Sequence, residues 1–296
     1  GRMKVTMVAL VFGCACNILL DPVLIFGLGP VPAMGIAGAA IATVIGQWVS
    51  GIMVIIFNLK FNPEVQLHKK YLPLEGKTVA AILTVGIPSI VMNGIGSVMN
   101  FGINQILQGF AETATGVFGV YFKLQSFIFM PVFGLNNGMV PIVAYNYGAR
   151  KPKRITKAIK LSIIYGVCIM LAGFAVFQLF PGSLLGIFSA SDDMMAIGIP
   201  ALRTISLSFL IAGFSVVASS VFQALGHGFL SLAVSVLRQL VVLLPAAFIL
   251  SKAGGLGACW WSFPIAEVLA GLLALYYLRR AHRRVIQPLA DQDYRF

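Results

Sequence analysis

Residues 3–27 read MKVTMVALVFGCACNILLDPVLIFG, an apolar run long enough to cross a bilayer as one helix, with a single carboxylate, Asp21, inside it. A charge at that depth costs about 3 kcal/mol or more, so an ionisable residue there is a candidate functional group. Asn17 lies on the same face of the helix, one turn before Asp21. Pro22 follows, and its missing N–H leaves the carbonyl of Ile18 without a helical partner. The segment therefore offers three hard oxygen ligands that suit a small cation or a proton relay.

The composition of the whole chain is that of a polytopic membrane protein. Of its 296 residues, 59% are hydrophobic and only 10% are charged, whereas soluble domains carry about 25% charged residues. The net charge of +12 does not indicate nucleic acid as a partner, because the basic residues cluster between apolar runs. Such clusters are typical of cytoplasmic loops beside anionic lipid, so the expected partner is the lipid bilayer.

Eight apolar segments are each long enough to span a bilayer. They cover residues 3–27, 33–57, 79–108, 114–146, 155–180, 196–225, 229–250 and 255–278. Lys and Arg concentrate in alternate connections and at the C-terminus, which places both ends of the chain in the cytoplasm. The sequence therefore predicts an all-α polytopic membrane protein with a cytoplasmic tail at residues 281–296.

The polar, proline-containing segment 58–78 divides the predicted helices into two bodies, 1–57 with two helices and 79–280 with six. An internal repeat supports this division. Gly35-Ile-Ala-Gly-Ala, which opens the second helix, matches Gly254-Gly-Leu-Gly-Ala, which opens the last one. Repeats of this kind are typical of secondary transporters, whose substrate path runs between the repeated halves. If both halves have six helices, we expect four helices before Gly1, in a parent chain of about 440 residues.

Several strings resemble those of the MATE (multidrug and toxin extrusion) transporters, over almost the whole chain. They are Asn17-Ile-Leu-Leu-Asp21-Pro22, Gly35-Ile-Ala-Gly-Ala-Ala-Ile-Ala-Thr43, Met130-Pro-Val-Phe-Gly-Leu-Asn-Asn-Gly138, Pro141-Ile-Val-Ala-Tyr-Asn-Tyr-Gly-Ala-Arg150 and Phe222-Gln-Ala-Leu-Gly226. The resemblance implies helices five to twelve of a twelve-helix, two-lobe fold. It also implies a monomer in the bacterial inner membrane that exchanges Na⁺ or H⁺ for amphipathic, cationic organic compounds and needs no other cofactor.

The resemblance further implies where the coupling ion binds. One branch of the family has its acids on helices seven and ten, but 79–108 and 196–225 contain none. The DinF-type branch uses an Asn and an Asp of helix five, a Thr of helix six and an Asp of helix one. Asn17, Asp21 and Thr43 match the first three, and Asp21 and Asn17 would hold Na⁺ in a sodium-coupled protein. The helix-one Asp would belong to the helices expected before Gly1.

Polar residues within the other apolar spans are candidates for a substrate cavity. For those on one face of 79–108, the alternative is hydrogen bonding between helices. For Lys123, the alternative is a side chain that extends to the outer interface. Glu267 could pair structurally with Arg238 or form a second coupling site. The tentative cavity set is Asn93, Ser97, Asn100, Asn104, Lys123 and Gln125.

Two other functions compete with drug antiport. A flippase for lipid-linked oligosaccharides would need several cationic residues in its cavity, and only Lys123 and Arg203 qualify. A membrane-embedded enzyme would need a catalytic cluster, and the sequence contains no His-rich motif or paired carboxylates, so we predict that the chain is not an enzyme. With two of six helices in its first lobe, we also expect the 296-residue chain not to transport alone.

Overall fold

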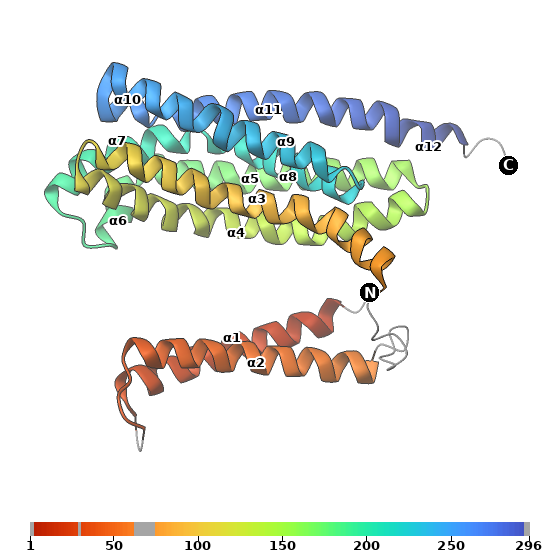
Figure 1. Ribbon diagram of the computed structural model, residues 1–296, viewed down its shortest axis with the longest axis horizontal. Helices are drawn as coiled ribbons and strands as arrows, with labels where there is room; N and C mark the ends of the chain where they lie inside the picture. The colour runs from red at the N-terminus through yellow and green to blue at the C-terminus, as the bar shows by residue number, and fades with distance from the viewer. Residues whose placement is uncertain (1–2, 29–30, 62–74, 293–296) are drawn as a thin grey trace. The chain divides into compact units, whose positions relative to one another are not determined.

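The computed structural model describes residues 3–28, 31–61 and 75–292, with side chains 3, 4, 81, 85, 88, 89, 93 and 290–292 outside that description. The described chain is helical and contains no strand, which confirms the all-α class (Figure 1). Six helices are long and apolar enough to cross a membrane, or seven if the bent pair α7 and α8 forms one span. The segment predicted at 79–108 folds as one further helix, α3 (Gly76–Gln108), and the count of eight spans stays a prediction.

The chain divides into two units, Gly1–Thr78 and Val79–Phe296. The division falls where the sequence predicts the end of the linker and the start of the six-helix lobe. Most of that linker, residues 62–74, lies outside the described residues.

The N-terminal unit is a hairpin of α1 (Met3–Phe26) and α2 (Ile36–Phe61) (Figure 1). Its buried seam consists of small residues, among them Gly13 on α1 and Gly38, Ala42 and Gly46 on α2. A Cβ atom added to Gly46 would lie 2.8 Å from the carbonyl oxygen of Gly13. The helices are therefore held together by close backbone packing, as in other small-residue membrane contacts, while large apolar side chains such as Trp48 face outward.

Two glycines shape the connection between α1 and α2. Gly27 (φ +73°) and Gly35 (φ +54°) adopt left-handed conformations that other residues avoid. The N–H of Gly35 donates to the carbonyl of Ile25 at 3.1 Å, and that of Met34 to the carbonyl of Leu24 at 3.0 Å. These bonds satisfy carbonyls at the end of α1. Because Gly35 is non-helical, α2 begins at Ile36, and the predicted start at residue 33 was too early.

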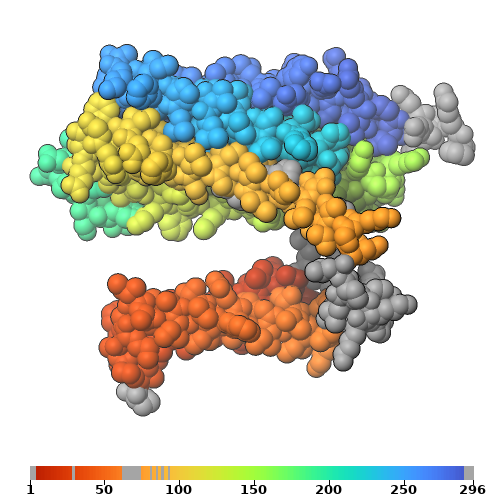
Figure 2. Space-filling view, in the orientation of Figure 1, coloured from red at the N-terminus to blue at the C-terminus, as the bar shows by residue number. Residues whose placement is uncertain are grey.

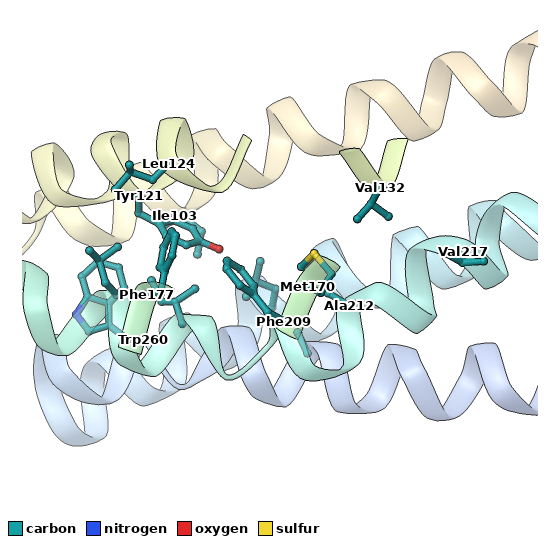
Figure 3. Close-up of a cluster of buried hydrophobic side chains, with 14 of the residues drawn as sticks. Ile103, Tyr121, Leu124, Val132, Met170, Phe177, Phe209, Ala212, Val217 and Trp260 are labelled. Carbon is teal, nitrogen blue, oxygen red and sulfur yellow. The ribbon is translucent and has the colours of Figure 1, made fainter. Parts of the chain in front are cut away.

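The C-terminal unit is a bundle around an aromatic core. Tyr121 and Phe177 meet edge to face with ring centroids 6.4 Å apart, and Phe177 and Phe209 lie 5.2 Å apart (Figure 3). After α3, its elements are α4 (Glu112–Gly148), α5 (Pro152–Leu179), α6 (Pro181–Gly186), α7 (Asp192–Ser206), α8 (Phe209–Ala224), α9 (Gly228–Val236), η2 (Leu237–Leu243), α10 (Leu244–Cys259), α11 (Ser262–Ala281), η3 (His282–Ile286) and α12 (Gln287–Gln292).

The span predicted at 196–225 is broken, which the sequence analysis missed. The chain bends by 51° between α7 and α8. Polar side chains satisfy the carbonyls at the break: Gln178 Nε2 donates to the carbonyl of Arg203 at 2.8 Å, and Ser208 Oγ to that of Ile205 at 2.7 Å. A membrane helix can be interrupted in this way where neighbouring side chains replace the lost bonds.

The last two predicted spans also have different bounds in the structure. A continuous helical run of α9, η2 and α10 extends from Gly228 to Cys259 instead of ending at residue 250. Gly255 (φ +69°, ψ −159°) is non-helical and separates two helical pieces within this run. The final long helix starts at Ser262 rather than at residue 255, so the second copy of the glycine repeat lies at the kink that precedes this helix.

Candidate functional site

The residues predicted to couple a cation lie in the α1–α2 hairpin. Asn17 packs against Gly46, where an added Cβ would lie 3.0 Å from the Asn17 Cβ. Asn17 Nδ2 donates a 3.4 Å hydrogen bond to Thr43 Oγ1, and Thr43 Oγ1 donates to the carbonyl of Ala39 at 2.9 Å. The Thr43 hydroxyl therefore orients the Asn17 amide nitrogen toward α2. The structure therefore brings together two residues, 26 positions apart in the chain, that the family resemblance groups. Their role in cation coupling stays a prediction.

Asp21 lies one helical turn beyond Asn17 and is half-buried. Its Oδ1 atom is shielded from solvent and has no hydrogen-bond partner among the described residues. A buried carboxylate oxygen without a partner is costly unless it is protonated or bound to a cation. Asp21 therefore has the surroundings of an ion-exchanging group, although its coupling role stays a prediction.

The predicted polar face of α3 does not line the cavity found within the C-terminal unit. The side of α3 that faces this cavity carries Met92, Gly96 and Met99. Ser97, Asn100 and Asn104 lie about a quarter turn further round the helix, and the side chain of Asn93 is outside the described residues. Their role at a path between the two lobes stays a prediction.

Lys123 and Gln125, both on α4, point in different directions. Gln125 lines the cavity together with Tyr121, one turn before it. The exposed Lys123 lies outside the described lining, and its ammonium nitrogen is 5.8 Å from the ring centroid of Phe188. This geometry is that of a cation–π contact at the protein surface. The structure thus brings one of the two candidates to the cavity.

The cavity has a volume of about 560 Å³ and combines aromatic and polar walls. Aromatic rings come from Tyr121, Phe122, Phe129 and Phe133 of α4 and from Phe263 of α11. Uncharged polar side chains come mainly from α4, α8 and η2, and include Gln125, Asn136, Asn137, Ser219, Ser220, Gln223 and Gln239. Such a mixture is typical of sites for small organic molecules.

One ion pair supplies all the formal charge in this lining. Arg238 Nη1 and Glu267 Oε2 lie 3.7 Å apart, so the structure forms the pairing considered from the sequence. Arg238 belongs to the π-helix η2, a widened turn before Pro245 whose missing N–H disfavours regular helix. Such π-segments occur frequently at functional sites. The pair leaves Glu267 Oε1 buried without a partner among the described residues.

Asn136 is one of several polar residues of this cavity that the sequence analysis missed. It is 5% exposed, and neither Nδ2 nor Oδ1 has a hydrogen-bond partner among the described residues. Helical spacing could have found it, because Asn136 continues the face of α4 that carries Tyr121 and Gln125. Unpaired donor and acceptor atoms therefore face a cavity large enough to hold water or a small ligand.

Comparison with known proteins identifies the family. The family model described as MatE matches residues 88–249, more than half of the chain. This chain belongs to the MatE family. Membership confirms the resemblance to MATE proteins, which are transporters rather than enzymes. The DinF-type branch stays a prediction.

Relatives of this MatE chain include multidrug export proteins. It is 27% identical to the multidrug export protein MepA of Staphylococcus haemolyticus (strain JCSC1435), over 96% of this chain and 62% of the relative. It is 28% identical to MepA of Staphylococcus aureus (strain MSSA476), over 94% of this chain and 61% of the relative. The chain thus spans about three-fifths of the length of these relatives.

A similar solved structure is described as the outward-facing conformation of a multidrug resistance MATE family transporter of the MOP superfamily. It is 26% identical in sequence, with a TM-score of 0.83 over 96% of this chain and 63% of that one. The helical arrangement is therefore that of a MATE transporter.

Proposed function

We propose that the whole protein is a cation-coupled antiporter that exports amphipathic, cationic organic compounds by alternating access. Family membership and the similarity to MepA proteins support drug export. The observation that carries the coupling step is the buried, unpartnered Oδ1 of Asp21, in the same hairpin as the Asn17–Thr43 hydrogen bond.

In this proposal Asp21 holds either H⁺ or Na⁺ when the hairpin is loaded and carries a bare charge when it is empty. Asn17 and Thr43 supply further oxygen atoms beside it in the sodium-coupled case. When Asp21 carries a bare charge, a helix packing that exposes the carboxylate to water is favoured. When Asp21 holds H⁺ or Na⁺, a packing that buries the carboxylate is favoured. The difference between those packings is what would drive alternating access.

The cavity of the C-terminal unit supports the proposed substrate class. Its described lining contains one cation and one anion, so it has no net positive charge to hold a lipid-linked anion. This observation favours drug export over an oligosaccharide flippase. Aromatic walls can stack on planar organic cations, and the free Asn136 and Glu267 atoms can accept or donate hydrogen bonds.

Other parts of the proposal follow from the sequence and the family. The whole protein would act as a monomer in the bacterial inner membrane, with its C-terminus in the cytoplasm. Transport would require no cofactor other than the coupling ion, Na⁺ or H⁺. The clusters of basic residues would contact lipid rather than nucleic acid.

The test is export of a fluorescent organic cation, such as ethidium, from cells that produce the whole protein. We expect Asp21→Asn to abolish export driven by a Na⁺ or pH gradient. Asp192→Asn is the matched control, since Asp192 is an exposed acid at the start of α7. Equal protein amounts in the membrane are checked by immunoblot. Export by Asp21→Asn at the parent rate would refute the coupling role.

A further inference from the structure

A crevice that shares no lining residue with the cavity described above lies where α5 begins and α11 continues into η3. It has a volume of about 400 Å³. Figure 2 shows the end of α11 (blue) beside the α4–α5 turn (green) at one end of the C-terminal unit. The walls of the crevice carry the aliphatic side chains of Ile159, Ile163, Ile164, Leu278 and Ile286.

Three cations stand on the rim of the same crevice. Lys160, Arg279 and Arg283 all line it, and all three side chains are exposed. No acidic side chain belongs to the lining, and none of the three has an ion-pair partner among the side chains that the structure describes. The positive charge is therefore available to a ligand.

The apolar side chains and the basic side chains of the crevice occupy different positions along the axes of the membrane-spanning helices. On α5, Ile163 and Ile164 lie about 4.5 to 6 Å further along the helix than Lys160, toward the middle of the apolar span. On α11 and η3, Leu278 precedes Arg279 and Arg283, which lie in the C-terminal part of the apolar run Ser262–Leu289. A ligand that fills the crevice would place an apolar chain toward the bilayer interior and an anion at the interface.

We propose that this crevice binds an anionic phospholipid, with its phosphate beside Lys160, Arg279 and Arg283 and an acyl chain against the isoleucines. Basic pockets between membrane helices are suited to acidic lipid head groups, and arginine matches the geometry of phosphate oxygens. A bound lipid would join the start of α5 to the end of α11. The inference does not depend on the transported substrate.

The experiment measures lipid binding to the purified chain in detergent by native mass spectrometry. The probe is phosphatidylglycerol, compared with phosphatidylcholine that has the same acyl chains. The test variant is Lys160→Gln with Arg283→Gln. Its matched control is Lys157→Gln with Arg284→Gln, which removes the same charge from the same two elements at positions outside the crevice. Circular dichroism verifies that both variants keep their helix content.

We expect the chain to prefer phosphatidylglycerol and the test variant to bind it about 30-fold more weakly, because each basic residue beside an anionic head group contributes a factor of about five. The control should bind as the parent does. Equal weakening in both variants would overturn the proposal in favour of a diffuse basic surface. Equal binding of phosphatidylcholine would leave only an apolar groove, and full competition by glycerol 3-phosphate would indicate a site for free phosphate; either result would also overturn it.

Discussion

Replacing Arg238 by methionine tests whether its pair with Glu267 stabilises the C-terminal unit. Met keeps the length of the apolar stem but removes the guanidinium. The side chain of Glu267 is 9% exposed and that of Arg238 is 25% exposed. The variant therefore leaves the more deeply buried member of the pair without its counter-charge.

The expected loss follows from the separation of the two groups. At 3.7 Å and an effective dielectric constant of about 20, two unit charges attract by about 4 kcal/mol. Partial contact of Arg238 with the cavity reduces this value, and breaking a buried pair typically costs about 3 kcal/mol. For a chain of this size, that loss lowers the melting temperature by about 6 °C.

The assay is thermal unfolding of the purified chain in detergent, followed by tryptophan fluorescence, to which the buried Trp260 contributes. Glu267→Gln should cost less than Arg238→Met, because it leaves the charge that can reach the cavity. The double variant should recover most of the loss, since removing both charges leaves no unpaired ion. If Arg238→Met melts at the parent temperature, or if the double variant is no better than the single one, the pair does not stabilise the fold.

Three further predictions concern backbone packing and the hairpin site. Gly213→Ala should cost about 2 kcal/mol by overpacking, because its Cβ would lie 2.7 Å from the carbonyl oxygen of Gly166; Gly119→Ala, which meets nothing within 4 Å, is the control in the same melting assay. Gly255→Ala should cost about 1–3 kcal/mol, since only glycine readily adopts φ +69° with ψ −159°, whereas a melting temperature equal to that of Gly257→Ala would contradict this reasoning. In the whole protein, Thr43→Val should raise the Na⁺ or H⁺ concentration needed for half-maximal dye export several-fold, because it removes the acceptor of the Asn17 amide. Thr43→Ser should restore the parent concentration. Identical ion dependence in the parent and both variants would exclude Thr43 from the site.

The sequence was most informative where a local pattern determines the packing. Gly38, Ala42 and Gly46 recur every four residues, and this spacing alone places a small-residue seam on one face of α2. The same periodicity places Asn17 and Asp21 on one face of α1. The meeting of Asn17 with Thr43 could be anticipated only through the family motif, because it depends on how the connection after Gly27 returns the chain.

The break between α7 and α8 could not be read from the apolar pattern. Residues 196–225 contain no Asp or Glu and are hydrophobic enough for one straight span. At the break, the carbonyl of Arg203 accepts hydrogen bonds from Gln178, which comes from α5, and from the nearby Ser206. The bond from Gln178 joins elements far apart in sequence, and such a contact is invisible to local hydropathy.

The cavity of the C-terminal unit could also be predicted only in part from the sequence. The face of α4 that carries Tyr121, Gln125 and Asn136 follows from helical spacing, so its composition could be predicted. The position of the Arg238–Glu267 pair in this cavity could not, because the two residues reach it from η2 and α11. The π-turn at η2 also shifts the register of residues 237–243 relative to a regular α-helix. An α-helical projection of the sequence thus assigns the wrong direction to the residues that follow this turn. The sequence offers the Arg238–Glu267 pair as one alternative, and the structure selects it and places it in the cavity wall.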